Sequence, residues 1–299
     1  MGGPQSLQGA DTDVVVGIDS DGCVFDTMEI KQKRCFHPLI VRHWQLAAIE
    51  AQVREVAEFV NLYSRWRGQN RFVALLQTFE WLTARTDLPA DHPPLPPLTA
   101  LRAYMHSGQP LSNANLAATV DRTADPELRR VLDWSLAVDE HIQRVVHALP
   151  PFDAARSAIA RLAESATVVV VSQTPTAALV REWAASGLQS YIQSIAGQEQ
   201  GTKSEILHTL QQTHGTSARL LMIGDAPGDW QAAQAARAAF YPIMPGDEDA
   251  SWQHLQTEAY PRFLKGTFDH AYQQQWVQKF EHRLPDQPPA HWFTTATGS

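Results

Sequence analysis

Acidic side chains follow an apolar run near the N-terminus at a spacing that suits chemistry. The run Val14–Ile18 leads into DSDG, where Asp19 and Asp21 lie two residues apart, and Asp26 follows four residues after the glycine. Carboxylates at the end of a buried strand are costly unless something compensates them. An acidic loop beside an ordinary strand would explain the pattern, and so would a site that gathers carboxylates around a cation. Because residues two apart in an extended chain point to the same side, a bend at Gly22 would let both acids address one ligand.

Polar residues also follow two later apolar runs. Ser172 ends the run VVVVS, and Asp225 and Asp229 lie in GDAPGD, directly after the run LLMI. Lys203 lies between these segments, in GTKSEIL. Each residue has an ordinary structural explanation when taken alone: a hydroxyl at a strand end, a solvated lysine in a first helical turn, or an aspartate that caps a helix. The order of the segments therefore carries more information than any one of them.

The segments that hold these residues alternate between strand and helix. Short runs rich in valine, isoleucine and leucine predict strands over residues 14–18, 168–171 and 220–223, with further strands in YIQSIAG and AFYPIM. Helical stretches separate them, including FDAARSAIARLAES, TPTAALVREWAASGL and WQAAQAARAA. For the second of these helices, Thr174 is the expected N-cap and Pro175 the first residue. The alternation predicts an α/β fold with a doubly wound parallel sheet.

This topology predicts where the polar residues meet. Ligands of open parallel sheets bind in the crevice outside the carboxyl ends of the strands. Asp19, Ser172 and Asp225 each follow a predicted strand. We therefore expect the three segments to form one site.

Residues 29–149 have a different sequence pattern. Long stretches with helical periodicity and no clear strand run through them, such as AAIEAQVREVAEFVNLYSRW, RFVALLQTFEWLTAR and PELRRVLDWSLAVDEHIQRVVHAL. The proline-rich DLPADHPPLPPLTAL predicts a loop or extended connection. We expect residues 1–13 to be a loose tail and 14–28 and 150–299 to form the sheet domain with a C-terminal arm. Residues 29–149 are then an inserted α-helical cap domain.

Two groups of side chains lie outside these motifs. The stretch YSRWRGQNRF is basic and aromatic, and its arginines are Arg65, Arg67 and Arg71. Arginine pairs with phosphate, so this stretch could recognise a substrate, although ordinary packing at a helix end is the favoured explanation. Segments around three tryptophans predict core packing or an arm on the sheet domain: Trp252, Trp276 and Trp292.

Composition limits the class of protein. The chain has 299 residues, of which 44% are hydrophobic and 19% charged, enough for one large or two moderate globular domains. The formal charge of −8 argues against a nucleic-acid or anionic-membrane partner. No apolar run approaches a membrane span, and the first residues lack the pattern of a signal peptide. With Cys23 and Cys35 as the only cysteines, we expect a cytoplasmic protein without a disulfide framework. Nothing in the pattern indicates the oligomeric state.

The four segments, in this order, resemble the motifs of the haloacid dehalogenase superfamily of phosphohydrolases. Residues 14–28 resemble its first motif, an apolar strand before D-x-D-G, and 168–175 its second, a strand ending in serine or threonine. Residues 200–206 supply the lysine of the third, and 220–229 the G-D-x-x-x-D of the fourth. Each motif is weak alone, but four in order are specific. The helical block occupies the position of the family's cap domain.

The resemblance implies a role for each motif residue. Asp19 would be the nucleophile that forms an aspartyl-phosphate, and Asp21 the general acid and base. Ser172, Lys203 and a backbone N–H at Gly22 would bind the substrate phosphate. The implied ligands of a magnesium ion are Asp19, Asp21, Asp225 and Asp229. Asp26 is expected to have a structural role.

The expected function is that of a Mg²⁺-dependent phosphohydrolase acting on a small phosphorylated metabolite. The acid at position 21 favours phosphate-ester chemistry, because the dehalogenase and phosphonate-cleaving branches of the family generally lack one there. Two alternatives stay open: a phosphomutase with the same nucleophile, and a non-catalytic protein that binds a phosphorylated ligand. The sequence shows no Walker A loop, no dinucleotide glycine fingerprint and no histidine–cysteine zinc pattern.

Overall fold

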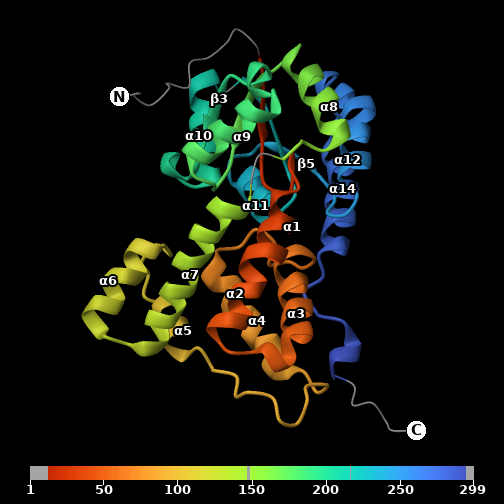
Figure 1. Cartoon of the computed structure of the whole chain (residues 1–299). Coiled ribbons are helices and arrows are strands. Elements are labelled where there is room, and N and C mark those ends of the chain that lie inside the picture. Colours follow the sequence, from red (N-terminus) through yellow and green to blue (C-terminus); the bar gives the residue numbers. More distant parts are fainter. Residues whose placement is uncertain (1–12, 147–148, 216, 294–299) are drawn as a thin grey trace. The chain divides into compact units, whose positions relative to one another are not determined.

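Figure 1 shows the computed structural model of the chain, which describes residues 13–146, 149–215 and 217–293. The chain divides into two compact units. Of the described residues, the sheet unit comprises 13–28 and 149–283, and the helical unit comprises 29–146 and 284–293. No helix in this described part is both long and apolar enough to cross a bilayer.

Five parallel strands form the sheet, in the order β3-β2-β1-β4-β5. Their bounds are β1 Val14–Ile18, β2 Thr167–Val171, β3 Ser194–Ala196, β4 Arg219–Gly224 and β5 Ala239–Pro242. The predicted doubly wound parallel sheet is confirmed. All residues of β1 and β2 are buried, which explains why these strands are continuous apolar runs rather than alternating ones.

Helices cover both faces of the sheet. They are α8 Asp153–Ala163, α9 Thr176–Ser186, α10 Lys203–His214, α11 Pro227–Ala235, α12 Glu248–His254, α13 Tyr260–Leu264 and α14 His270–Arg283. Val16 and Ile18 pack in one core with side chains of α8 and α12. Gly17 points to the opposite face, against Leu207 of α10. Helix α14 contacts the edge strand β5, where the Gln273 side chain accepts a hydrogen bond from the Phe240 N–H at 2.8 Å.

The strand order creates a switch point next to the first strand. From β1 the chain proceeds to β2 and β3 on one side, and then crosses to β4 and β5 on the other. Ile18 pairs with Val170 of β2 and with Ile223 of β4, so the three central strands end nearly level. Open α/β sheets bind ligands at the carboxyl edge of such a switch point.

The helical unit has its own core. Its helices are α1 Thr27–Lys31, which begins in the sheet unit, α2 His37–His43, α3 Glu50–Leu62, α4 Arg71–Ala84, α5 Thr99–Met105, α6 Asn113–Thr123 and α7 Pro126–Val145, with a π-helical turn at Gln32–Phe36. The three helical stretches predicted from periodicity are confirmed as α3, α4 and α7. The proline-rich connection has no helix or strand up to Leu98. Trp44 lies at the centre of the core, with ring centroids 5.2 Å from Phe79 and 6.0 Å from Trp134.

The C-terminal segment 284–293 belongs to the helical unit, which corrects the prediction of an arm on the sheet domain. Trp292 is fully buried, and its ring meets that of Phe59 edge-on at 5.5 Å. Its Nε1 donates a hydrogen bond to Glu55 at 3.0 Å, and the Arg85 guanidinium lies 4.7 Å from the ring centroid. The indole therefore contacts an aromatic ring, a hydrogen-bond acceptor and a cation in this core. The pattern of apolar residues along the sequence does not show this combination of contacts.

The other two C-terminal tryptophans pack in the sheet unit, as predicted. Trp252 is buried, and its Nε1 donates to the Cys23 carbonyl oxygen at 2.8 Å. Trp276 is partly buried against the same core and lies 5.5 Å from the Tyr241 ring. The tryptophan-rich tail thus divides between the two units.

His37 is a buried titratable residue of the helical unit. Its side chain is fully buried, and neither ring nitrogen has a hydrogen-bond partner within the described ranges. Burial, with smaller effects from the charges of Arg54 and Lys33, lowers the pKa of His37 from 6.5 to about 3. The imidazole is therefore neutral in the folded protein, whereas an exposed histidine of the unfolded chain binds a proton below pH 6.5.

We expect this difference to make the helical unit sensitive to acid. Because the unfolded state binds the additional proton, stability falls as the pH drops below 6.5 towards 3. A single such group should lower the free energy of unfolding by about 2 kcal/mol at pH 5 relative to pH 7.5. Urea unfolding of His37→Leu should lack this component, whereas the exposed His106→Leu should keep it. An unchanged pH dependence in His37→Leu would contradict the prediction.

Candidate active site

The predicted polar residues lie at the carboxyl edge of the central strands. Asp19 directly follows β1, and its N–H continues the ladder by donating to the Ile223 carbonyl oxygen at 3.0 Å. Ser172 directly follows β2 and is buried; its N–H donates to the Ala196 carbonyl oxygen at 3.0 Å. Asp225 directly follows β4 and is fully buried. The parallel register thus brings these strand-end residues to one edge, on both sides of the switch point.

Lys203 joins the acids of this edge. Its Nζ lies 2.7 Å from Asp19 Oδ2 and 2.5 Å from Asp229 Oδ1. The local sequence places it, because Thr202 caps α10: the Thr202 hydroxyl accepts from the Glu205 N–H at 3.2 Å, and the Glu205 carboxylate accepts from the Thr202 N–H at 2.7 Å. This capping box fixes Lys203 as the first helical residue. Its neighbourhood shows that it is not a solvated first-turn lysine.

Asp229 has two functions in this arrangement. Its Oδ1 accepts from Lys203, and its Oδ2 accepts from the Ala226 N–H at 3.0 Å, which satisfies a free donor at the start of α11. Asp229 is the third residue of α11, and the N-cap residue is Ala226. The alternative that Asp229 is itself the N-cap of this helix is therefore wrong. Gly224 makes room for it, because a Cβ at position 224 would lie 2.3 Å from Asp229 Cγ. The glycine of GDAPGD is therefore required by close approach.

Gly224→Ala should disturb the site without touching a charged group. The added methyl would displace Asp229, and such overpacking typically costs about 1–3 kcal/mol. Gly228→Ala is a matched control in α11, because a Cβ there meets nothing within 4 Å. Chemical unfolding of both variants measures the difference. Equal stabilities of the two would mean that Asp229 is not held as closely as described.

The electrostatics of the site favour the binding of a cation. Burial, together with the charges of Asp229 and Asp225, raises the pKa of Asp19 from 3.8 to about 8, although Lys203 opposes the rise. Burial also acts to lower the pKa of Lys203, but Asp19 and Asp229 outweigh it and raise that pKa above its ordinary value. One ammonium group thus faces more buried carboxylates than it can neutralise, and a further cation would favour the ionised form of Asp19.

Three of the predicted acids fit a metal ion. Asp19, Asp225 and Asp229 can each place one carboxylate oxygen within 4.8 Å of the others, and all three are buried. Carboxylate oxygens are the hard donors that Mg²⁺ and Ca²⁺ prefer. The group could therefore hold a divalent cation. The Asp21 carboxylate does not belong to it, so its predicted place among the ligands is not supported by this arrangement.

Asp21 is held instead by two hydroxyl groups. Thr174 Oγ1 donates to Asp21 Oδ2 at 2.8 Å, and Thr27 Oγ1 donates to Asp21 Oδ1. Thr174 was predicted as the N-cap of α9, but that helix begins at Thr176 and its N-cap position is Pro175. Neither threonine was recognised as a site residue from sequence. The position of Thr174, two residues beyond Ser172 in the second motif, was the available indication.

Comparison with known proteins agrees with the motif pattern. The family model of haloacid dehalogenase-like hydrolases matches residues 102–242, which include Ser172, Lys203, Asp225 and Asp229. This match agrees with the resemblance of the motifs to the haloacid dehalogenase superfamily. Asp19 and Asp21 precede the matched range, and the geometry given above links Asp19 to it through Lys203. The comparison with curated proteins found no match for this chain.

Solved structures with some likeness to this chain include three from bacteria. A protein assigned as a phosphoglycolate phosphatase from Lactobacillus delbrueckii subsp. bulgaricus has 12% identity and a TM-score of 0.47, over 82% of this chain and 92% of that one. A haloacid dehalogenase-like hydrolase from Streptococcus pneumoniae has 15% identity and a TM-score of 0.41, over 82% of this chain and 92% of that one. The L-2-haloacid dehalogenase from Xanthobacter autotrophicus has 14% identity and a TM-score of 0.40, over 90% of this chain and 86% of that one. Likenesses of this size say nothing about the substrate of this chain.

The Gly22 amide is not available in the way the motif suggested. The Gly22 N–H donates to the Phe25 carbonyl oxygen at 2.8 Å, so its predicted role as a phosphate donor is corrected. Gly22 has φ of 79°, a left-handed conformation that glycine adopts without strain, and it turns the loop after Asp21. Asp26 is exposed at the end of this loop.

The basic stretch of the helical unit is largely used for structure. Arg67 is buried, and its Nη1 donates to the Leu62 carbonyl oxygen at 2.9 Å. Arg71 donates to Ser135 and lies 2.7 Å from Asp139. Arg65, with a side chain that is 61% exposed, extends over the Trp66 ring. These contacts favour the packing explanation over substrate recognition for Arg67 and Arg71.

Proposed function

We propose that this protein is a Mg²⁺-dependent phosphohydrolase that removes phosphate from a small phosphorylated metabolite. The observation that carries the proposal is the Lys203 ammonium held between Asp19 and Asp229 at the edge where buried carboxylates gather. A preorganised cation beside a strand-end carboxylate suits a reaction that moves a highly charged phosphoryl group. Asp21 supports phosphate-ester chemistry rather than dehalogenation, because it supplies a second acid two residues from the nucleophile.

In the first proposed step, a carboxylate oxygen of Asp19 attacks phosphorus. The new bond joins that oxygen to phosphorus, and the bond between phosphorus and the ester oxygen breaks. Asp21 gives its proton to the leaving oxygen. In the second step, Asp21 takes a proton from water, which attacks the aspartyl-phosphate, releases inorganic phosphate and restores the Asp19 carboxylate.

The remaining residues of the site hold and orient these groups. Thr27 and Thr174 fix the orientation of the Asp21 carboxylate. Lys203 stabilises charge on the phosphoryl oxygens, and Ser172 donates a hydrogen bond to one of them. The carboxylates of Asp19, Asp225 and Asp229 would hold Mg²⁺, which supplies positive charge to offset that of the phosphate. We assign Asp21 to proton transfer alone, because its carboxylate lies outside this group.

The proposal is tested by measuring phosphate release from a broad panel of phosphomonoesters, with Mg²⁺ or with a chelator. We expect release from at least one compound with Mg²⁺, and loss of release when the metal is removed. Asp21→Asn should lower kcat by about 10²–10⁴-fold, the usual contribution of acid–base catalysis. Asp26→Asn, a change to an exposed acid of the same loop, is the control and should retain activity. Metal-independent release, or no release from any compound, would overturn the proposal.

A further inference from the structure

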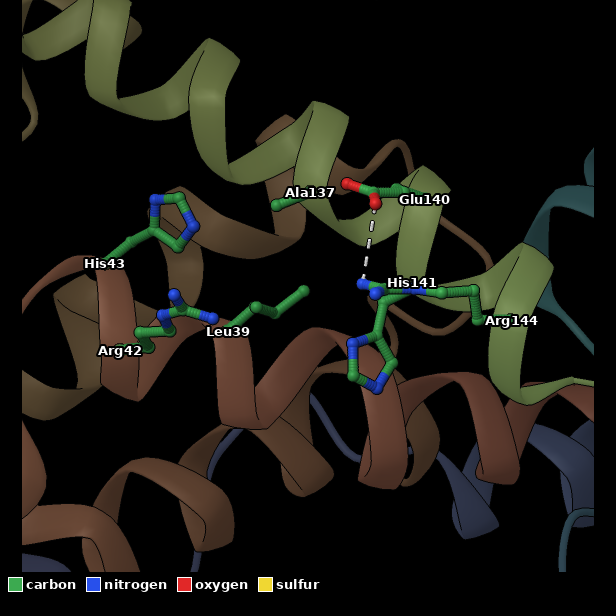
Figure 2. Close-up of a pocket in the computed structure, with 7 residues that line it drawn as sticks. All are labelled: Leu39, Arg42, His43, Ala137, Glu140, His141 and Arg144. Carbon is green, nitrogen blue, oxygen red and sulfur yellow. Dashed lines mark ion pairs between the residues drawn. The ribbon is translucent and has the colours of Figure 1, made fainter.

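A groove on the helical unit has no place in the proposed reaction. It lies between α2 and α7, has a volume of about 340 Å³ and is lined by Leu39, Arg42, His43, Ala137, Glu140, His141 and Arg144. Figure 2 shows the side chains of both helices directed into the space between them. This volume lies at the lower end of the range for small-molecule sites.

The lining of the groove is net positive. Among the described residues that line it are two arginines, two histidines and one acidic side chain. The acid, Glu140, pairs with Arg144 at 3.7 Å, but the two side chains are 69% and 64% exposed, so the pair contributes little and can exchange partners. Arg42 is exposed on the facing helix. The groove therefore presents guanidinium groups from two helices without an equal number of carboxylates.

His43 lies near charged side chains of both helices. Burial and the adjacent Arg42 lower the pKa of His43, Arg130 lowers it further, and Asp133 opposes them. A bound anion would counter the cations and raise this pKa again. His43 can thus report on an occupant without being required to bind it.

The groove also has an apolar wall. Leu39 is 6% exposed and belongs to the core of the helical unit, and Ala137 packs against the same core from α7. Apolar walls with a few convergent polar groups are typical of small-molecule sites. Guanidinium groups bind both carboxylate and phosphate oxygens in a two-pronged geometry. An occupant should therefore combine a short apolar skeleton with one of these anions.

We propose that the α2–α7 groove binds a small organic anion, with a phosphate-type or carboxylate group between Arg42 and Arg144 and an apolar skeleton on Leu39 and Ala137. The groove lies wholly within the helical unit. The inference does not depend on the proposed reaction, because binding can be measured without turnover and without a metal ion.

The test uses three probes with the same four-carbon chain: butylphosphonate, valerate and butanol. The ring signals of His43 and His141, assigned with His43→Gln and His141→Gln, are followed by NMR in the presence of a chelator. We expect saturable shifts with butylphosphonate, valerate or both, a higher apparent pKa of His43 in the complex, and no saturable shift with butanol. A response to one anion alone identifies the preferred group.

Charge-matched variants separate specific binding from general attraction. Arg42→Gln/Arg144→Gln should weaken binding by about tenfold or more, because charge-assisted hydrogen bonds are lost. Arg102→Gln/Arg122→Gln removes the same charge from the helical unit away from the groove and should bind as wild type does. Saturable shifts with neither anion, equal weakening in the two double variants, or an equal response to butanol would overturn the proposal.

Discussion

Asp19→Asn is expected to abolish phosphate release, by at least about 10⁴-fold, as is usual for loss of a catalytic nucleophile. The amide has nearly the shape of the carboxylate but cannot attack phosphorus. Because burial raises the pKa of Asp19 to about 8, its ionised form costs stability at neutral pH. The variant should therefore fold and melt at a temperature equal to or above that of the wild type, so lost activity cannot be attributed to unfolding.

Rapid quenching followed by mass spectrometry makes this prediction specific. In the wild type, a phosphoryl adduct should appear on the peptide that contains Asp19, and it should be absent from Asp19→Asn. Asp26→Asn provides the matched control, as another neutralised acid in the same loop. Substantial release by Asp19→Asn, or an adduct on another peptide, would show that the nucleophile is misassigned.

Trp292→Ala is expected to have the largest effect on stability among these variants. The indole is fully buried, and its loss removes the Phe59 contact, the Arg85 cation and the hydrogen bond to Glu55. Truncation of a buried tryptophan typically costs about 3–5 kcal/mol. Hydrogen exchange should show faster exchange in α3 and α4, because they supply Glu55, Phe59 and the residue next to Arg85.

The neighbouring residue provides the control for this change. Phe293 is 39% exposed, and its ring centroid lies 6.0 Å from that of Trp81. Phe293→Ala should cost less than about 1 kcal/mol, as surface changes usually do. Similar exchange rates in the two variants would mean that the C-terminal segment does not stabilise the helical unit.

The sheet and the acidic edge could be predicted because they depend on local patterns. Runs of β-branched residues identify the buried strands, and parallel topology then requires Asp19, Ser172 and Asp225 to end at one edge. The position of Lys203 follows from the T-x-x-E pattern of its capping box, a local feature that sequence can also show.

Other parts of the site depend on contacts between distant segments. Thr174 meets Asp21 across 153 positions of the chain, and a threonine after a strand gives no indication of which carboxylate its hydroxyl will reach. The glycine at position 22 predicts a turn of the loop. It does not indicate that the Gly22 N–H donates a hydrogen bond to the Phe25 carbonyl oxygen within that loop. Trp292 could have packed in either core, because an apolar residue satisfies the same pattern in both.

The C-terminal segment also links the sheet unit covalently to a buried residue of the helical unit. The backbone passes between them after Met28, between residues 146 and 149, and again after Arg283. Six residues separate the end of α14 at Arg283 from the turn Ala290–Phe293 that seats Trp292. Fully extended, six residues span only about 20 Å, so this connection limits the distance between the end of α14 and the turn. Any movement that took Arg283 farther than this from Ala290 would have to remove Trp292 from its core, so the stability of one buried indole limits the distance between these two residues.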